Sequence, residues 1–333
     1  MENVEKAIEQ VKKELPCLEL LENENMSGHC SFKIGGPVRA VAYPSGVSAL
    51  TQICCILKEN HVAPMMLGNC TNILFPDEGM QDMFFINTGK LTKMFLLPDG
   101  AVYAEAGVPL SKLAGFAWQN SLTGLEFASG IPGTLGGACM MNAGAYGGEL
   151  KDCIESVVCY YLPEQGLCEL TREECSFAYR SSLFRKRPGF VILSAVLRLE
   201  KGDSGEIAEK MRQLNEKRRE KQPLDLPSAG SAFKRPEGHY AAQLIEDAGL
   251  KGLSVGGAQV SEKHAGFVVN KNRATSHDVH ELMMQVRRKV YENSGVVLEP
   301  EIIILPPDFR LEDNGPAVPR NVIVSGDNME RAD

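Results

Sequence analysis

The segment SGIPGTLGGACMMNAGAYGG, residues 129–148, combines seven glycines with no charged side chain. Glycine has no Cβ atom, so the main chain of such a segment can approach a flat ligand or a diphosphate closely, and a positive φ is not penalised. Successive backbone N–H groups in such turns can also form a concave binding site for an anion. A tight corner that packs two lobes together would need the same residues. The segment by itself therefore leaves a ligand-binding and a purely structural interpretation open.

Two further turns rich in small residues resemble it. KIGGP (33–37) and MLGNCTNIL (66–74) each adjoin a predicted strand. The sequence contains neither GxGxxG after a strand nor GxxxxGK[ST], which argues against a Rossmann dinucleotide site and a P-loop. Three such turns converging on one elongated ligand predict a phosphate-bearing cofactor held mostly by backbone amides.

Composition narrows the class of protein. The chain has 333 residues, of which 44% are hydrophobic, enough for two or three domains. Its net charge of -8 and the lack of a long Lys/Arg run argue against a nucleic-acid-binding or membrane-surface protein. No stretch approaches the roughly 20 apolar residues of a membrane span. The charged, amphipathic first 15 residues do not resemble a secretory signal, and the ten cysteines form no CxxC pair. We therefore expect reduced thiols and a cytoplasmic protein.

Hydrophobic periodicity and turn residues predict a mixed α+β fold in three parts. In the first part we expect helices over 1–15 and 47–60, a strand through Val41, and short strands within 63–69 and 82–89. In the second we expect a hairpin over 93–107 turning at Pro98-Asp99-Gly100, a helix over 109–120, and strands within 153–163, 167–175 and 189–202. In the third we expect helices over 204–223, 240–252 and 275–295, a strand over 265–270, and a loosely held tail from Asp308. Thr275 and Asp278 have the spacing of a capping box.

Seven segments occur in the order found in one enzyme family. They are SFKIGGP, LGNCTNIL, GLEFASGIPGTLGGA with MNAGAYGGE, FAYRSSLF, PSAGSAFKRP, LIEDAGLKG with VGGAQVSEKHAGFVVN, and LEPEI. Together they cover roughly residues 27–305 and resemble the UDP-N-acetylenolpyruvoylglucosamine reductases. These flavoenzymes make UDP-N-acetylmuramate for bacterial peptidoglycan, and hence serve cell wall biogenesis, cell shape and cell division.

The resemblance implies a fold and two cofactors. Residues 1–90, with a C-terminal strand and tail near 300–333, would form the first FAD-binding lobe, and residues 91–206 the second. This two-lobed region is of the vanillyl-alcohol-oxidase (PCMH) type. Residues 207–307 would form a C-terminal α/β substrate-binding domain. FAD would be bound non-covalently and reduced by NADPH, the substrate would be a UDP-sugar, and we expect a monomer.

By the same resemblance the three turns would hold FAD. The expected contacts are Ile34, Gly35, Gly36, Gly68, Asn69, Cys70, Thr71, Asn72, Gly130, Ile131, Pro132, Gly133, Gly136, Gly137, Asn142, Gly144 and Ala145. Most relatives have Gly-Gly-Ser where this chain has Asn69-Cys70-Thr71. Asn tolerates a positive φ better than most residues, so we expect the turn to survive.

The resemblance also assigns the chemistry. Hydride addition to C3 of an enol ether leaves negative charge on C2 and its carboxylate, so the transition state needs a cation and a proton donor. The family's catalytic arginine corresponds to Arg180 in FAYR, where a surface arginine paired with Glu173 or Glu174 would otherwise be expected. The proton donor to C2 corresponds to Ser231. The third catalytic residue corresponds to Glu301 in EPEI, acting with a raised pKa in a closed site. Glu299 would share a strand face with it, so only motif position favours Glu301.

The nucleotide end of the substrate has three candidate contacts by motif position, Tyr179, Lys221 and Arg235. The short spacing from Arg180 to Ser231, together with Arg235 in place of asparagine, matches the shorter type of the family, which lacks an inserted loop bearing a tyrosine.

Other functions stay open at this point. The chain could be an FAD-dependent oxidase of the wider family acting on an alcohol or sugar; such enzymes often tether the flavin, and Cys139 would then be the candidate. A non-catalytic flavin-binding protein is a third possibility, against which Arg180, Ser231 and Glu301 argue together. His277 and His280 share a helix face, but no third ligand accompanies them, so we expect no metal site.

Overall fold

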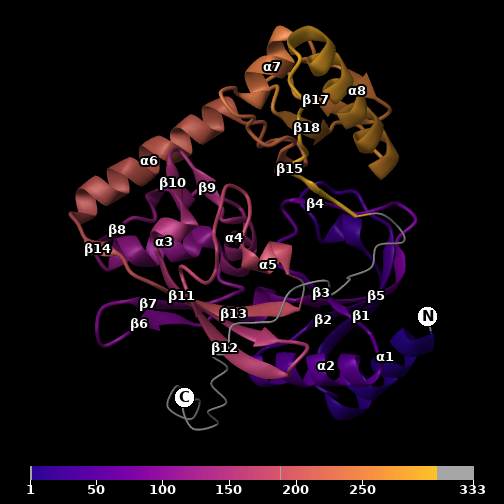
Figure 1. The fold of residues 1–333 in the computed structure, drawn as a ribbon, viewed down its shortest axis with the longest axis vertical. Coiled ribbons are helices and arrows are strands. Elements are labelled where there is room, and N and C mark those ends of the chain that lie inside the picture. The colour runs from indigo at the N-terminus through magenta and orange to yellow at the C-terminus, as the bar shows by residue number, and fades with distance from the viewer. Residues whose placement is uncertain (1, 188, 306–333) are drawn as a thin grey trace.

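The computed structural model describes residues 2–187 and 189–305 (Figure 1). The tail from Asp308, predicted to be loosely held, lies outside these residues. Within them, three sheets of four, five and four strands follow one another along the chain, accompanied by three pairs of short strands and three isolated bridges.

The first sheet has three parallel strands and one antiparallel edge strand. Its strand order is β1 (Glu19–Asn25), β2 (Pro37–Tyr43), β5 (Met80–Asn87) and β3 (Pro64–Leu67). β2, β5 and β3 are parallel, and α2 (Val47–Glu59) supplies the crossover that parallel strands require. The strand β1, which the sequence analysis did not predict, pairs antiparallel with β2. The helix α1 (Glu2–Glu14) packs beside α2, and both predicted helices are confirmed.

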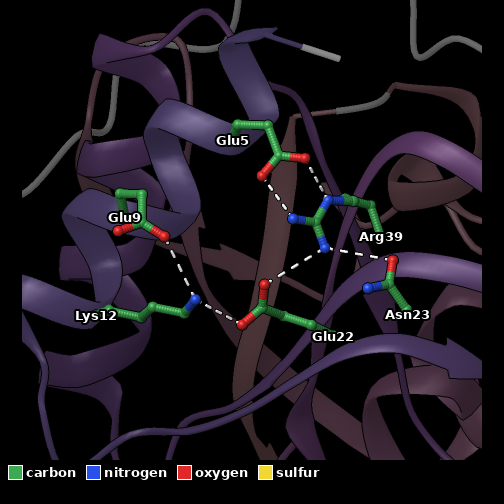
Figure 2. Close-up of polar contacts among 6 residues, drawn as sticks. All are labelled: Glu5, Glu9, Lys12, Glu22, Asn23 and Arg39. Carbon is green, nitrogen blue, oxygen red and sulfur yellow. Dashed lines mark hydrogen bonds and ion pairs between the residues drawn. The ribbon is translucent and has the colours of Figure 1, made fainter.

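An ion-pair network ties α1 to this sheet (Figure 2). Arg39 on β2 donates two hydrogen bonds of 2.5 Å to the carboxylate of Glu5 on α1, and its third nitrogen lies 3.3 Å from Glu22 on β1. The Lys12 Nζ atom on α1 lies 2.6 Å from the carboxylate of the same Glu22 and also contacts Glu9. The Arg39 side chain is only 16% exposed, so solvent screens this network less than an ordinary surface pair.

Replacing Arg39 with methionine is expected to lower the melting temperature by a few degrees at low salt, and by less at high salt. The network joins three elements, so its loss should loosen α1. Thermal unfolding followed by circular dichroism would measure this. Lys6→Met removes an exposed pair within α1, Lys6 with Glu2, and is the matched control, expected to change little. Equal effects of the two substitutions would contradict a special role for Arg39.

The second sheet is antiparallel throughout, with the order β12 (Gly166–Thr171), β11 (Ile154–Tyr161), β13 (Phe190–Leu197), β7 (Val102–Glu105) and β6 (Met94–Leu96). The hairpin predicted around Pro98-Asp99-Gly100 is confirmed as β6–β7. Core residues of α3 (Leu110–Gln119), α4 (Leu135–Met141) and α5 (Leu183–Lys186) pack together with the inner face of this sheet. Side chains of the opposite face, including Tyr160 and Val191, share a core with α2. The helix α2 is therefore packed between the first two sheets.

The glycine-rich segment is not a loop throughout, which corrects the expectation of an irregular turn. Residues Leu135–Met141 form α4, and the Thr134 hydroxyl accepts a hydrogen bond from the backbone of Gly137 at the start of this helix. Leu135, Ala138 and Cys139 are buried, at the spacing of one helix face. This burial stabilises the helix although it contains two glycines.

The third sheet belongs to the last part of the chain, which follows the long helix α6 (Ser204–Lys221). Its order is β15 (Ser228–Ser231), β18 (Phe267–Asn270), β17 (Ala258–Val260) and β16 (Ser254–Val255), accompanied by α7 (Ala241–Asp247) and α8 (Ser276–Ser294). The predicted capping box of Thr275 and Asp278 is present, and Gly295 ends α8 with a φ of 71°.

The chain then returns to the first lobe. β19 (Ile303–Ile304) pairs parallel with β4 (Ile73–Leu74), directly after the 68–72 turn. Core residues of the first lobe, of α8 and of this returning segment form one cluster. The smaller elements are β8 (Leu122–Thr123) with β14 (Glu200–Lys201), β9 (Gly144–Ala145) with β10 (Gly148–Glu149), and the 3-10 turns Met26–Gly28, Thr88–Lys90, Glu126–Ala128 and Leu150–Asp152.

Candidate active site

Arg180 and Glu301, 121 positions apart in the sequence, form the central ion pair of the site. The Arg180 Nε–H donates to Glu301 Oε1 at 2.6 Å, and the two side chains are 18% and 14% exposed. Arg180 also donates to the Gly144 carbonyl at 3.2 Å. Its backbone is left-handed, with a φ of 52°, inside a turn closed by the bridge between Ala178 and Ser181. The expected alternative, a surface pair with Glu173, is wrong, because Glu173 pairs with Arg172.

Ser231, on the third sheet, lies next to the segment that carries Glu301. The backbone N–H of Glu301 donates to the carbonyl of Ala232 at 2.9 Å, and Phe233 forms a bridge with Pro300. Ser231 is the last residue of β15, next to Ala232. Its hydroxyl makes no hydrogen bond to another residue of the part that the structure describes. The fold thus gathers all three predicted catalytic residues around residue 301.

Asn72 connects this group to the first lobe. Its side-chain amide donates to the Glu301 carbonyl at 3.2 Å, and its own carbonyl accepts from Ile303 at 2.9 Å. The predicted cofactor turn 68–72 therefore touches the segment that carries the predicted catalytic glutamate.

Burial distinguishes Glu301 from Glu299. The expectation that both lie on one strand face is wrong, because the regular strand begins only at Ile303. Glu299 is 70% exposed and pairs with Lys234 at 3.0 Å. Burial raises the pKa of Glu301, although the nearby guanidinium groups of Arg180 and Arg185 lower it. Glu301 is therefore the carboxyl group suited to holding a proton in this site.

This raised pKa predicts a pH-dependent stability. A group whose pKa is higher in the folded state stabilises the fold when protonated, and that contribution is lost as the pH rises through its folded pKa. The Glu301→Gln variant keeps a neutral side chain at every pH. We expect its free energy of unfolding to increase relative to that of the parent protein as the pH rises from about 4 to about 8, so the variant becomes relatively more stable.

Urea unfolding across this range would measure the difference. Glu299→Gln is the matched control, since its carboxylate is exposed, and its difference from the parent protein should stay flat. A flat difference for Glu301→Gln as well would contradict the raised pKa.

An open cavity of about 790 Å³ adjoins Arg180. It is lined by the β9–β10 hairpin, by Tyr179 and by the segment from Arg235 to Gly238. The Tyr179 hydroxyl accepts a hydrogen bond from the backbone N–H of Arg235 at 3.0 Å, and the Arg180 guanidinium lies 5.0 Å from the Tyr179 ring centre. Tyr179 and Arg235 are thus brought together with Arg180. Lys221 is exposed at the end of α6 and is not part of the cavity wall.

Two of the predicted cofactor turns lie against each other. The Asn69 side chain donates to the Pro132 carbonyl at 2.8 Å, and a Cβ atom on Gly68 would lie 2.3 Å from the Thr134 hydroxyl. At Gly133 and Gly137, by contrast, a Cβ atom would approach neighbouring atoms only to 3.9 and 3.6 Å. Internal packing therefore does not require glycine at these two positions. Bare main chain here fits a ligand that lies directly on the backbone, as FAD would.

The third predicted turn has a packing role of its own. A Cβ atom on Gly36 would lie 1.9 Å from the Asp77 carbonyl oxygen, and one on Gly35, where φ is 139°, would lie 2.6 Å from Phe75 Cβ. Ile34 and Gly35 also line a second cavity of about 440 Å³, together with Lys33 and Arg273. The packing of residues 33–37 against residues 75–79 is thus sufficient reason for these glycines, and their contact with FAD stays a prediction.

The remaining predicted cofactor residues surround the first two turns. Gly136 and Gly130 permit close approaches to Ala106 and to α6, and Ile131 packs against the core of the second lobe. Gly144 and Ala145 line the large cavity. The buried Asn142 amide donates to Glu149 and Ala178 at 3.1 Å, and its oxygen accepts from Lys151. Its side chain therefore braces the β9–β10 hairpin.

Cys70 and Cys139, the two cysteines in the predicted cofactor segments, are buried, and burial favours their neutral thiol form. Cys70 has a φ of 48° and is buried, and burial raises its pKa to about 12. Cys139 is completely buried in α4, which also raises its pKa. A flavin tethered to Cys139 would need an exposed, reactive thiol, so its burial argues against the tethered oxidase.

Two residues of the site escaped the sequence analysis. Arg185 on α5 donates to the Arg180 carbonyl at 3.3 Å and to Met141 Sδ at 2.7 Å, so it supports the left-handed turn. Tyr146, 48% exposed at the hairpin tip, lines the large cavity with a φ of 54°. The sequence could have indicated Tyr146, because a tyrosine directly before two glycines is typical of an exposed turn. No local pattern marks Arg185.

Within residues 2–187 and 189–305, neither a metal-binding cluster nor a membrane-spanning helix is present. No three His, Cys, Asp or Glu side chains there are grouped so that they could hold a metal ion. No helix there is both long and apolar enough to cross a membrane.

The sequence and fold of this chain match those of known proteins. Residues 38–162 match the FAD binding domain, and residues 222–305 match the C-terminal domain of UDP-N-acetylenolpyruvoylglucosamine reductase. The protein of that name from Caldanaerobacter subterraneus is 45% identical over 299 residues, covering 90% of this chain and 97% of its own. The one from Alkaliphilus oremlandii is 46% identical over 301 residues, covering 90% and 98%.

A solved structure agrees. The crystal structure of UDP-N-acetylenolpyruvylglucosamine reductase from Thermus caldophilus superposes with a TM-score of 0.73 at 31% identity, covering 87% of this chain and 99% of that one. The predicted mixed α+β class, with a two-lobed FAD-binding region and a C-terminal domain, is confirmed. The chain therefore belongs to the UDP-N-acetylenolpyruvoylglucosamine reductase family.

Proposed function

We propose that this protein reduces UDP-N-acetylglucosamine enolpyruvate to UDP-N-acetylmuramate with NADPH, using FAD, in the synthesis of peptidoglycan precursors. The observation that carries the proposal is the 2.6 Å pair between Arg180 and Glu301, with Ser231 directly before Ala232, whose carbonyl accepts from the Glu301 N–H. Three separate sequence motifs supply these residues. Packing alone gives no reason for a half-buried arginine, a buried carboxyl group and a free hydroxyl at one point.

FAD, when bound, takes up two electrons from NADPH and makes them available to the double bond of the enol ether. The bare main chain at Gly133 and Gly137, with the adjoining 68–72 turn, would hold it. Backbone amides in such turns suit its diphosphate.

Arg180 binds the substrate carboxylate in this proposal. Negative charge grows on that carboxylate and on C2 during the reaction, and a guanidinium group in a site with little water stabilises it strongly. Arg185 holds the Arg180 main chain in place through its carbonyl.

Ser231 delivers a proton from its hydroxyl to C2, where the basic carbon makes serine an adequate acid. Glu301, whose pKa burial raises, keeps a proton available close to that hydroxyl and orients Arg180. The overall change consumes NADPH and one proton and saturates the carbon–carbon double bond.

Each part of the chain has its own role in this function. Residues 1–90 with the chain end near 300–333, and residues 91–206, act as the FAD-binding lobes. Residues 207–307 bind the UDP-sugar through Arg235, and Tyr179 of the second lobe joins them from across the cavity. Lys221, on the outer end of α6, is the weakest of the three nucleotide contacts. The protein works as a monomer in the cytoplasm, in cell wall biogenesis and therefore in cell shape and division.

One experiment tests the function. Purified protein should be yellow, should release its flavin on acid precipitation, and should oxidise NADPH only when UDP-N-acetylglucosamine enolpyruvate is present. Colour that stays with the precipitate, together with oxidation of an alcohol or sugar, would instead establish the oxidase. A colourless protein that does not bind added FAD would refute both.

A further inference from the structure

Cys159 and Cys168 face each other across two neighbouring strands of the second sheet. The antiparallel register of β11 and β12 pairs these two residues directly, and both are free thiols. Directly opposite residues of such a pair have Cα atoms about 4.5–5.5 Å apart, and a disulfide bond needs about 4.4–6.8 Å. Their side chains project from the same face of the sheet, into the core of the second lobe. The backbone therefore already has the spacing that a disulfide bond between them requires.

The two thiols also interact with each other. A hydrogen bond from Cys159 lowers the pKa of Cys168, whereas burial, together with the same bond, raises the pKa of Cys159. The buried Cys30 thiol, by contrast, donates to the backbone carbonyl of Ile34 at 3.2 Å. Cys168 is therefore the more easily ionised member of a pair whose sulfur atoms are in contact, and the thiolate is the form that reacts with oxidants.

The position of β12 gives an oxidant a route to Cys168. This strand is the outermost of its sheet and has a single neighbour, β11, among the described strands. Cys168 is 4% exposed, whereas Glu169 and Thr171 of the same strand are exposed. An edge strand can open locally without global unfolding, so opening of β12 uncovers Cys168 while the rest of the core stays closed. Cys159 lies on β11, between β12 and β13, and is not uncovered in the same way.

We propose that Cys159 and Cys168 form a reversible disulfide site that takes a peroxide as oxidant and fastens β12 to β11. The Cys168 thiolate attacks one peroxide oxygen, the O–O bond breaks, and the other oxygen leaves as hydroxide, so that Cys168 becomes a sulfenic acid. The Cys159 thiol gives up its proton to the hydroxide, and its sulfur attacks the Cys168 sulfur and displaces the remaining oxygen. The two thiols together lose two electrons and two protons, and the peroxide becomes two molecules of water. This inference does not depend on the proposed function.

The test treats the Cys17→Ser variant with hydrogen peroxide, because the exposed Cys17 would react on its own. Remaining thiols are then blocked with a maleimide, and the chain is cleaved after glutamate, which separates the two cysteines at Glu164. We expect mass spectrometry to find one linked pair of peptides, carrying Cys159 and Cys168, which dithiothreitol separates again. The buried Cys139 is an internal control and should keep its thiol.

Two further variants, made in the same background, test the separate roles. Cys159→Ala lacks the second thiol, so Cys168 should proceed to the irreversible sulfinic acid. Cys168→Ala should leave Cys159 reduced, because no edge strand opens to uncover it. The linkage itself is measured on the chain that keeps both cysteines, so the test does not require either variant to fold.

Hydrogen exchange measures whether the bond fastens the strand. In the oxidised protein the backbone amides of β12 should exchange about tenfold or more slowly than in the reduced protein, because β12 can then open only with β11. Unchanged exchange would contradict this part of the proposal. No linked peptide, or a linkage that involves another cysteine, would overturn the disulfide site. Equal oxidation of Cys139 would also overturn it, since this indicates entry of peroxide through global unfolding.

Discussion

Replacing Ser231 with alanine is expected to lower kcat by about 10²–10⁴-fold, the usual contribution of a positioned proton donor. The hydroxyl has no hydrogen-bond partner among the described residues, so its removal should leave the fold and FAD binding intact. The defect should also be confined to one half of the reaction. Stopped-flow measurement should show normal reduction of the bound flavin by NADPH and very slow reoxidation by the enol ether.

Ser228, three residues earlier on β15, offers a matched control. It lines the same strand but contributes its carbonyl to Ser31, which the alanine variant retains. Ser228→Ala should therefore turn over at close to the parent rate. Normal reoxidation in Ser231→Ala would mean that another group protonates C2, and the mechanism would be wrong even if the family is right.

Replacing Arg180 with methionine is expected to lower kcat/KM by about 10²–10³-fold, as found when one donor to a developing negative charge is removed. We expect kcat to fall and KM to rise, because in the proposed function Arg180 binds the substrate carboxylate in the ground state and stabilises the charge that grows on it. Arg180→Lys should recover only part of the loss, since an ammonium group cannot bind a carboxylate through two parallel bonds. Steady-state kinetics with the enol ether as the varied substrate would separate kcat from KM.

Arg172→Met is the control for Arg180, because Arg172 forms the exposed pair with Glu173 that the sequence offered as an alternative partner. It should have no effect. Because Arg180 also lowers the pKa of Glu301, Arg180→Met should raise that pKa further. An Arg180→Met variant with nearly unchanged kcat/KM would remove the observation on which the proposed function depends.

Local sequence patterns predicted most of the helices and strands correctly. Amphipathic periodicity located α1 and α2, charged composition located α6, cap residues located α8, and Pro98-Asp99-Gly100 located the β6–β7 hairpin. The failures have a common cause. The strand β1 and the helix α4 are stabilised by what packs against them, β2 in one case and the core of the second lobe in the other. Neither contact is visible in a window of neighbouring residues.

The same distinction applies to the site. Motif order predicted Arg180, Ser231 and Glu301 as catalytic residues, but the neighbouring residues could not exclude Glu299 or a surface role for Arg180. The 70% exposed Glu299 and the 14% exposed Glu301 differ only in the burial that the folded chain imposes. At residues 34–36 the sequence pattern is ambiguous in another way. Its glycines fit the cofactor motif, but they are also required by the close packing against Phe75 and Asp77, which the sequence does not reveal.

The sequence by itself determined the kinds of chemistry available: bare main chain for a ligand, a guanidinium, a hydroxyl and carboxyl groups, each on its own motif. The tertiary structure alone decided which of them meet and which carboxyl group is buried, so that its pKa is raised. The physical reason is that pairing and desolvation depend on distances between residues such as 180 and 301, which lie far apart along the chain and become neighbours only when the lobes pack together.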